Sequence, residues 1–147
     1  MNQQTIYRFD QILTPTHLRL TGMSDAEVSR PPAPGRWSKK EVLGHLIDSA
    51  ANNHQRFVRA QLAASLEFPA YEQERWVAAQ SYATQSWPDM VDLWLFYNRH
   101  LVHILGAMPE AALATPCTIG SNAPMPLAEI VTGYVDHLEK HLAQILE

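Results

Sequence analysis

The sequence predicts an all-α fold, a four-helix bundle with long crossover connections. Four segments carry apolar residues at helical spacing, none alternates with the period of two that marks a β-strand, and proline-rich stretches separate them. A chain of 147 residues can bury one continuous core and is short for two. We therefore expect a single domain over residues 1–147, with its four helices packed as a bundle.

The first two helices are expected over residues 5–20 and 38–64. Pro15 interrupts the first pattern, and a residue that precedes a proline is biased away from helical geometry. Three prolines and a glycine in residues 30–36 predict a loop. The second helix begins at a capping box, with Ser38 as the N-cap and Glu41 at the third helical position, and it runs without a proline to about Ala64.

The last two helices each follow a long connection. Residues 65–85 contain a short helical pattern over 72–80, and connections of this length often carry function. Pro88 is tolerated in the first turn of the third helix, which continues to about Met108. Its buried stripe is expected to comprise Met90, Trp94, Tyr97, Leu101 and Leu105. After a second loop, Pro126 opens a helix that runs to the C-terminus.

Composition and charge narrow the class of protein. Hydrophobic residues make up 46% of the chain and charged residues 18%, which is typical of a globular protein. A net charge of −4 without clusters of Lys or Arg argues against a nucleic-acid partner and against a membrane-surface role. The N-terminus lacks a signal-peptide pattern and no apolar run approaches the length of a membrane span, so we expect a cytoplasmic protein.

Two common zinc motifs are absent. Cys117 is the only cysteine, which excludes an intrachain disulfide and a multi-cysteine zinc site. Its neighbourhood, residues 114–120, is interpreted as a loop. The peptidase motif H-E-x-x-H requires a glutamate directly after its first histidine, but Leu138 follows His137, and Glu139 falls on the opposite side of the helix.

His137 and His141 lie four residues apart on the last helix, about 40° apart around its axis. The apolar stripe of that helix comprises Leu127, Ile130, Val131, Tyr134, Leu138, Leu142 and Ile145. His141 falls within this stripe and His137 at its edge, so both are expected to face the bundle interior. Because a buried imidazole needs a hydrogen bond or a metal, the spacing alone allows a core hydrogen bond or a metal clamp.

A polar line follows the second helix, within about 60° of one direction. It comprises His45, Asp48, Asn52 and Arg56. Two interpretations are open: the line is the solvated face of an amphipathic helix, or it is a polar groove that faces the histidine pair of the last helix. In the second interpretation His45, His137 and His141 form one ligand set. No ligand role is assigned to the remaining histidines, His17, His54, His100 and His103.

These motifs resemble those of the DinB-like superfamily, and most closely its YfiT-type branch, the bacillithiol S-transferase group. The resemblance is carried by residues 44–50 (GHLIDSA) with Asn52 and Arg56, and by Tyr134, His137, His141 and Ile145 on the last helix. The pair Trp37-Ser38 and the segment 68–76, with its Phe-Pro-x-Tyr start and closing Trp, are also similar. The resemblance covers residues 30–147. A third histidine beside the last-helix pair, frequent in that branch, is absent here.

The resemblance implies a four-helix bundle with long crossovers and a divalent metal, most often zinc or nickel, held by His45, His137 and His141. Members of the superfamily transfer low-molecular-weight thiols to electrophiles or isomerise thiol adducts, and others are assigned as metal-dependent hydrolases. The implied partners are a small-molecule thiol and an electrophilic substrate. Exposed aromatic residues in the long connection are compatible with a homodimer.

Three neutral histidines leave coordination positions open, which is the arrangement of a catalytic metal site. Such a metal lowers the pKa of a bound thiol or water. Asp48 or Asn52 is expected to orient a ligand or the nucleophile. Arg56 is expected to bind a substrate carboxylate, because its planar fork matches that group. Thiol transfer is the leading hypothesis, hydrolysis by metal-bound hydroxide is the second, and a non-catalytic metal-binding stress-response protein is the third.

Overall fold

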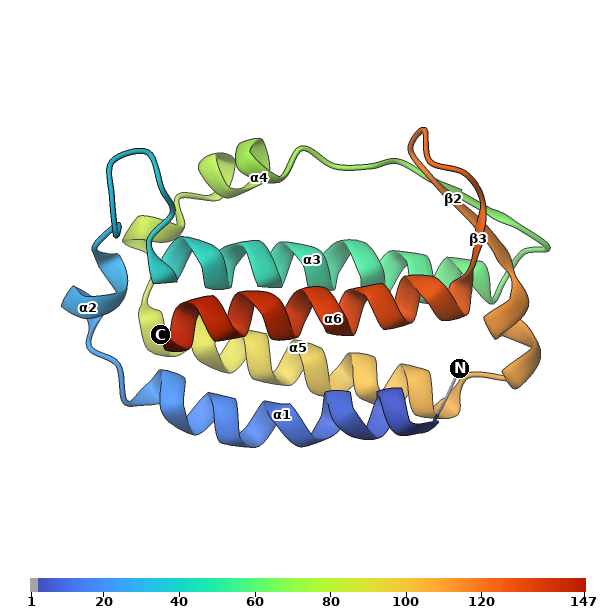
Figure 1. Cartoon of the computed structure of the whole chain (residues 1–147), viewed down its shortest axis with the longest axis horizontal. Helices are drawn as coiled ribbons and strands as arrows, with labels where there is room; N and C mark the ends of the chain where they lie inside the picture. The colour runs from blue at the N-terminus through green and yellow to red at the C-terminus, as the bar shows by residue number, and fades with distance from the viewer. Residues whose placement is uncertain (1–2) are drawn as a thin grey trace.

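Four long helices form the predicted bundle in the computed structural model, which describes residues 3–147 (Figure 1). They are α1 (Gln3–Thr21), α3 (Lys39–Ala60), α5 (Trp87–Ala107) and α6 (Leu127–Leu146). Helix α1 packs against α5 and α6, and α3 packs against the same two helices. Figure 1 shows that α3 and α6 run side by side in opposite directions. The two halves of the predicted histidine site therefore lie on neighbouring helices.

The starts of the helices follow the local signals in the sequence. The Ser38 hydroxyl accepts from the Glu41 amide at 3.2 Å, and the Glu41 carboxylate accepts from the Ser38 amide at 3.1 Å, which completes the capping box of α3. Ser86 caps α5 in the same way through the Asp89 amide at 3.3 Å. These caps fix the helical phase of the residues that follow.

Helix α1 continues through Pro15, where the sequence suggested an interruption. Proline removes one backbone hydrogen bond from a helix interior, which normally bends or ends the helix. Here Pro15 is on the exposed side, while Phe9, Leu13 and Leu20 are buried against the bundle. Because tertiary packing supplies most of a helix's stability, this buried stripe holds α1 together across the proline.

The connections contain short helices. The predicted helix over 72–80 is present as α4 (Gln73–Gln80), and a short helix, α2 (Asp25–Ser29), precedes α3. Two 3₁₀ turns, η1 (Tyr82–Thr84) and η2 (Glu110–Ala114), lie before α5 and after it. Helix α3 ends at Ala60 rather than Ala64. Residues 62–65 are all exposed, so a further helical turn there would bury nothing.

A small sheet joins the two long connections, and the sequence did not predict it. Strand β2 (Pro116–Ile119) pairs in parallel with β1 (Leu66–Phe68) and antiparallel with β3 (Met125–Pro126). Strands this short give no detectable alternation. Cys117, which was expected in a loop, lies in β2 with 0% of its surface exposed. The sheet fixes both connections beside α3 and α6 (Figure 1).

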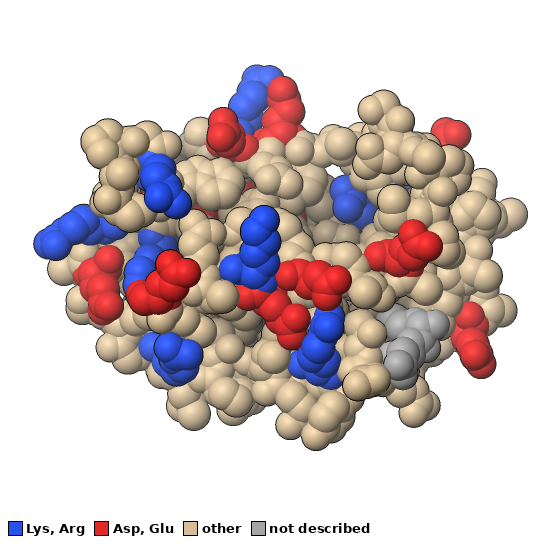
Figure 2. All heavy atoms as spheres, viewed as in Figure 1, with Lys and Arg blue, Asp and Glu red and all other residues tan. Residues whose placement is uncertain are grey.

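The core lies between the four helices and extends under the connections. Its largest buried side chains include Trp94, Phe9 and Phe57. Tyr82 closes the core above α3 by packing directly on Gly44, where a Cβ atom would lie 2.2 Å from the Tyr82 ring. On the face in Figure 2, acidic and basic side chains are interspersed rather than gathered. Within residues 3–147, none of the helices combines the length and apolar character that crossing a membrane requires.

Candidate metal centre

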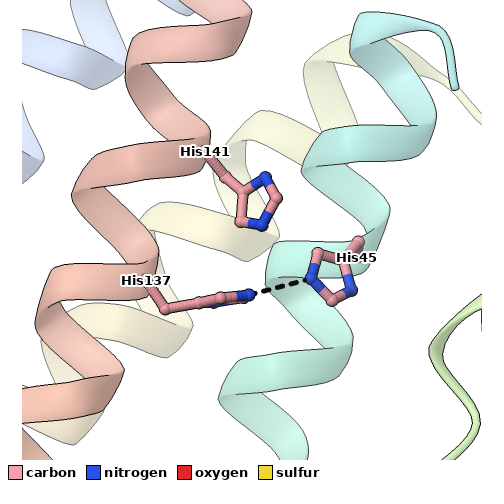
Figure 3. A group of neighbouring side chains, drawn as sticks. All are labelled: His45, His137 and His141. Carbon is pink, nitrogen blue, oxygen red and sulfur yellow. Dashed lines mark hydrogen bonds between the residues drawn. The ribbon is translucent and has the colours of Figure 1, made fainter.

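Two adjacent helices bring three histidines together. His45 follows the α3 cap by about two turns, and His137 and His141 occupy successive turns of α6. One ring nitrogen from each histidine lies within 4.8 Å of the other two. Figure 3 shows the three rings converging on the space between α3 and α6. The structure thus favours the polar-groove interpretation of the His45 face over a solvated one.

The three rings are in close mutual contact. The Nε2 atoms of His45 and His137 lie 3.1 Å apart (Figure 3). The ring centroids of His137 and His141 are 4.4 Å apart, and each lies 5.0 Å from the centroid of His45. The indole of Trp37 packs against His45 at a centroid distance of 5.1 Å. Trp37 is the residue directly before the α3 cap, so the same local motif positions His45 and one of its covering rings.

The electrostatic environment keeps two of these histidines neutral. Burial, followed by the repulsion of His137 and His141, lowers the pKa of His45 from 6.5 to about 4. Burial, followed by the repulsion of His141 and Lys140, likewise lowers the pKa of His137 to about 4. Both rings are therefore uncharged at neutral pH and present nitrogen lone pairs, which is the form that binds a metal.

The second nitrogen of each ring influences which nitrogen is free to act as a ligand. Nδ1 of His141 lies 3.0 Å from the side-chain oxygen of Gln144. If Nδ1 donates to that oxygen, Nε2 is left as the lone pair. Nδ1 of His45 is buried and has no hydrogen-bond partner among the described residues. His45 is thus held mainly by ring packing.

The donor set fits a divalent transition metal. Nitrogen ligands of an ideal tetrahedral zinc site lie about 3.3 Å apart, close to the 3.1 Å between His45 and His137. Imidazole nitrogens suit zinc, nickel, copper or iron. Among residues 3–147, no carboxylate or thiol joins this histidine group.

A cavity of about 360 Å³ opens beside the histidines. Helix α3 supplies Ser49, Asn53 and Arg56 to its wall, and α6 supplies Tyr134 and His137. The connections add a third side, with Tyr71, Gln73, Asn122 and Met125. Its size lies in the range of small-molecule sites. In Figure 2 the surface is hollowed between α3 and the connection above it, and a basic side chain is recessed there.

The predicted polar line is divided between two sides of α3. Arg56 lines the cavity that His137 also lines. Asp48 instead faces η1 and α4, where it accepts hydrogen bonds from Tyr82 at 2.6 Å and from Gln80 at 2.7 Å. Burial raises the pKa of the Asp48 carboxyl. The side-chain amide of Asn52 donates to the Asp48 carbonyl at 2.9 Å, so neither residue lines the cavity beside His137.

Two cavity residues on α3, Ser49 and Asn53, were not singled out by the sequence analysis. They lie four and eight residues after His45, so helical phase alone places them near its face. The Asn53 amide donates to the Ser49 carbonyl at 2.8 Å. What the sequence lacked was the side of α3 on which α6 packs, which decides whether Ser49 and Asn53 or Asp48 and Asn52 face the cavity. Tyr71 was noted only as part of the family resemblance.

The remaining described histidines lie apart from the three-histidine group. His54 contacts the Tyr97 hydroxyl at 2.8 Å and packs edge-on against His100. His17 contacts the Asp92 carboxylate at 2.9 Å on another face, between α1 and α5. Within residues 3–147, neither these histidines nor His103 joins the three-histidine group.

Sequence comparison relates the chain to one family. The family model of the DinB superfamily matches residues 8–145. A relative from Geobacillus thermodenitrificans is 28% identical over 133 residues, and one from Oceanobacillus iheyensis is 26% identical over 126 residues. Each alignment covers 86% of this chain and 72% of the relative. Both relatives bear the name "putative metal-dependent hydrolase".

Structural comparison shows the same fold in two solved proteins. YfiT from Bacillus subtilis, described as a probable metal-dependent hydrolase with an unusual four-helix bundle topology, matches with a TM-score of 0.87 at 18% identity. That match covers 97% of this chain and 82% of YfiT. The mycothiol-dependent maleylpyruvate isomerase matches with a TM-score of 0.79 at 11% identity, over 97% of this chain and 60% of the isomerase.

Proposed function

The chain belongs to the DinB superfamily, as its motifs predicted, and we propose that it is a metal-dependent enzyme that transfers a low-molecular-weight thiol to a small electrophile. The observation that carries this proposal is the group of three histidines, one of which, His137, lines a cavity of small-molecule size. Three nitrogen ligands leave coordination positions open for a substrate. The expected metal is divalent, zinc or nickel, and the expected ligands are His45, His137 and His141.

The protein's own residues prepare the site for this chemistry. A divalent metal supplies Lewis acidity that lowers the pKa of a thiol. His45 and His137 keep their lone pairs available because their pKa values are about 4. The cavity beside His137 offers the space in which a substrate can be held next to the histidine group. In the transfer, the thiol proton passes to solvent, sulfur forms a bond to the electrophilic carbon, and the leaving group departs with its bonding electrons.

The lack of a carboxylate in the three-histidine group, among the described residues, favours thiol transfer over hydrolysis. Metal-dependent hydrolases commonly use a glutamate beside the metal as a general base. Two carboxylates that lie close to the histidines in the sequence are engaged elsewhere: Asp48 accepts from Tyr82, and Glu139 lies 3.4 Å from Arg8. A thiolate is a nucleophile without further activation, so transfer needs no such base. The thiol dependence of the structurally similar isomerase also supports this choice.

Hydrolysis is the second candidate, and one observation favours it. Glu129 lines the same cavity as His137, so a carboxylate does face the space in which a substrate would lie. The two sequence relatives are named for metal-dependent hydrolysis. In this alternative the nucleophile is water, and Glu129 is the residue available to receive its proton.

Metal binding is tested by elemental analysis and zinc titration of protein purified without a histidine tag. His45→Ala, His137→Ala and His141→Ala should each lower zinc affinity more than tenfold, because each removes one of three ligands. His100→Ala is the matched control, since His100 is an exposed histidine that pairs with His54 outside the site. Full zinc occupancy in one of the three site variants would remove that residue from the ligand set.

The activity is tested by following thioether formation between 1-chloro-2,4-dinitrobenzene and cysteine, glutathione or mycothiol. We expect a rate that disappears on chelation, returns with zinc or nickel, and is lost in His137→Ala. The same preparations are assayed with a p-nitrophenyl ester. Metal-dependent ester cleavage without thioether formation would refute transfer in favour of hydrolysis. Stoichiometric metal binding without either reaction would support the non-catalytic alternative.

A further inference from the structure

Arg56 is a partly buried cation without a partner. Its Nε atom is buried and has no hydrogen-bond acceptor among residues 3–147, and no carboxylate in those residues forms an ion pair with the guanidinium. The other two buried or half-buried basic side chains in this range have acceptors: Lys40 binds Asp25 at 2.9 Å, and Lys39 binds the Glu147 carbonyl at 2.9 Å. An unpaired buried charge is costly, so its retention requires an explanation.

The guanidinium is nevertheless held in place. It lies over the ring of Phe68, 5.4 Å from the centroid. Phe68 belongs to β1, and its register partner in β2 is Ile119. This packing covers one face of the planar group and leaves its edges, which carry the N–H donors, free for an acceptor. The sheet therefore pre-organises Arg56 for a planar anion without supplying one.

Arg56 and His137 line the same cavity, so one ligand can reach both ends. Eleven residues separate His45 from Arg56 on α3, which is three turns, or about 16 Å along one face. Ser49 and Asn53 lie between them on α3, and these two residues line the cavity together with Gly133 of α6. Gly133 has nothing within 4 Å of the position that its Cβ would occupy, so the wall is open there. The cavity thus forms a channel along α3 whose wall is mostly apolar and holds the Arg56 cation, His137 and one carboxylate, Glu129.

We propose that the thiol substrate of this site is an elongated molecule that carries a carboxylate, which Arg56 binds through its guanidinium while the sulfur lies at the three histidines. This proposal rests on the proposed thiol transfer and specifies its substrate class. A carboxylate accepts two parallel N–H bonds from an arginine fork, and that geometry fixes the ligand along the channel. A shorter thiol cannot occupy both ends.

The proposal is tested with three thiols: 8-mercaptooctanoate, its neutral match 8-mercapto-1-octanol, and the short acid 3-mercaptopropanoate. Affinities are measured by titration calorimetry, and arrival of sulfur at the metal is followed separately by the sulfur-to-cobalt absorption band of cobalt-loaded protein. We expect the long acid to bind at least tenfold more tightly than the alcohol and than the short acid. Arg56→Met should abolish this preference for the carboxylate.

Arg59→Met is the matched control, because Arg59 lies on the same helix but is exposed and binds Gln55. It should keep the full carboxylate preference. Arg56→Met should also unfold at no lower denaturant concentration than the unaltered protein, whereas a purely structural Arg56 would lower that midpoint. An equal affinity for acid and alcohol, or a preference that survives Arg56→Met, overturns the proposal. If the cobalt band is absent, the proposal that the thiol binds the metal fails. The difference in affinity between the long acid and the alcohol still shows whether Arg56 binds a carboxylate.

Discussion

Acidification of the metal-free protein should lower its stability, because the folded structure disfavours protonation of the histidine group. The pKa of His45 is about 4 in the folded protein and 6.5 for a free imidazole. Between pH 6.5 and pH 4, the His45 imidazole is protonated in the unfolded chain but stays neutral in the folded protein. Stability that is present above pH 6.5 is therefore lost as the pH falls toward 4. The perturbation is a comparison of the chelator-treated protein near pH 7.5 and near pH 4.5.

The size of the loss follows from the two pKa values. At about pH 4.5, a pKa that falls from 6.5 to about 4 corresponds to a loss of about 2.6 kcal/mol in the free energy of unfolding. His45 has 0% of its surface exposed, so solvent screening reduces this little. His137 is partly exposed, and its similar shift is worth about half as much. The sum is a large fraction of a typical stability of about 5–15 kcal/mol.

The assay is urea unfolding of chelator-treated protein at both pH values, for the unaltered chain and for His45→Gln. The variant should be less stable at neutral pH, but its pH-dependent loss should be smaller by about 2.6 kcal/mol. His103→Gln removes an exposed histidine of α5 and should leave the pH-dependent loss unchanged. If His45→Gln and the unaltered protein lose equal stability on acidification, the electrostatic account of the histidine group is refuted.

Three further predictions concern the supports of the site. Gly44→Ala should lower stability by about 1–3 kcal/mol, because its Cβ would lie 2.2 Å from the Tyr82 ring; Gly106→Ala, with open space around it, should stabilise by about 0.5–1 kcal/mol, and equal effects in urea unfolding would contradict this. Ser38→Ala should lower the free energy of unfolding by about 1 kcal/mol in the same measurement, because it removes the cap of α3. Thr132→Ala is the control, because the Thr132 hydroxyl binds the Ala128 carbonyl within α6 and caps no helix. Removing the metal should lower the midpoint of thermal unfolding. When free zinc is 100-fold above its Kd, the bound metal adds about 2.7 kcal/mol to the free energy of unfolding. An unchanged midpoint would argue against a metal bound to the folded protein.

Local sequence signals predicted most of the helical architecture. The capping box at Ser38, the proline that opens α6 and the 3.6-residue stripes placed the long helices within a few residues of their observed bounds. The errors occurred where local and tertiary preferences disagree. Pro15 opposes a helix locally, yet packing carries α1 through it. The strands are too short for a periodic signal and form only because β2 meets β1 and β3 across long sequence separations.

In the candidate site, too, local geometry was predictable from the sequence and the packing of distant segments was not. Helical phase follows from a chain's own geometry, so the sequence alone turned His137 and His141 toward the interior and aligned His45 with Arg56. The pairing of helices depends on packing between distant segments, and only the tertiary structure brought His45 within 3.1 Å of a residue 92 positions away. It also decided that α6 lies on the Ser49 side of α3, which directed Asp48 toward Tyr82 and left Arg56 without an acceptor in the channel beside His137.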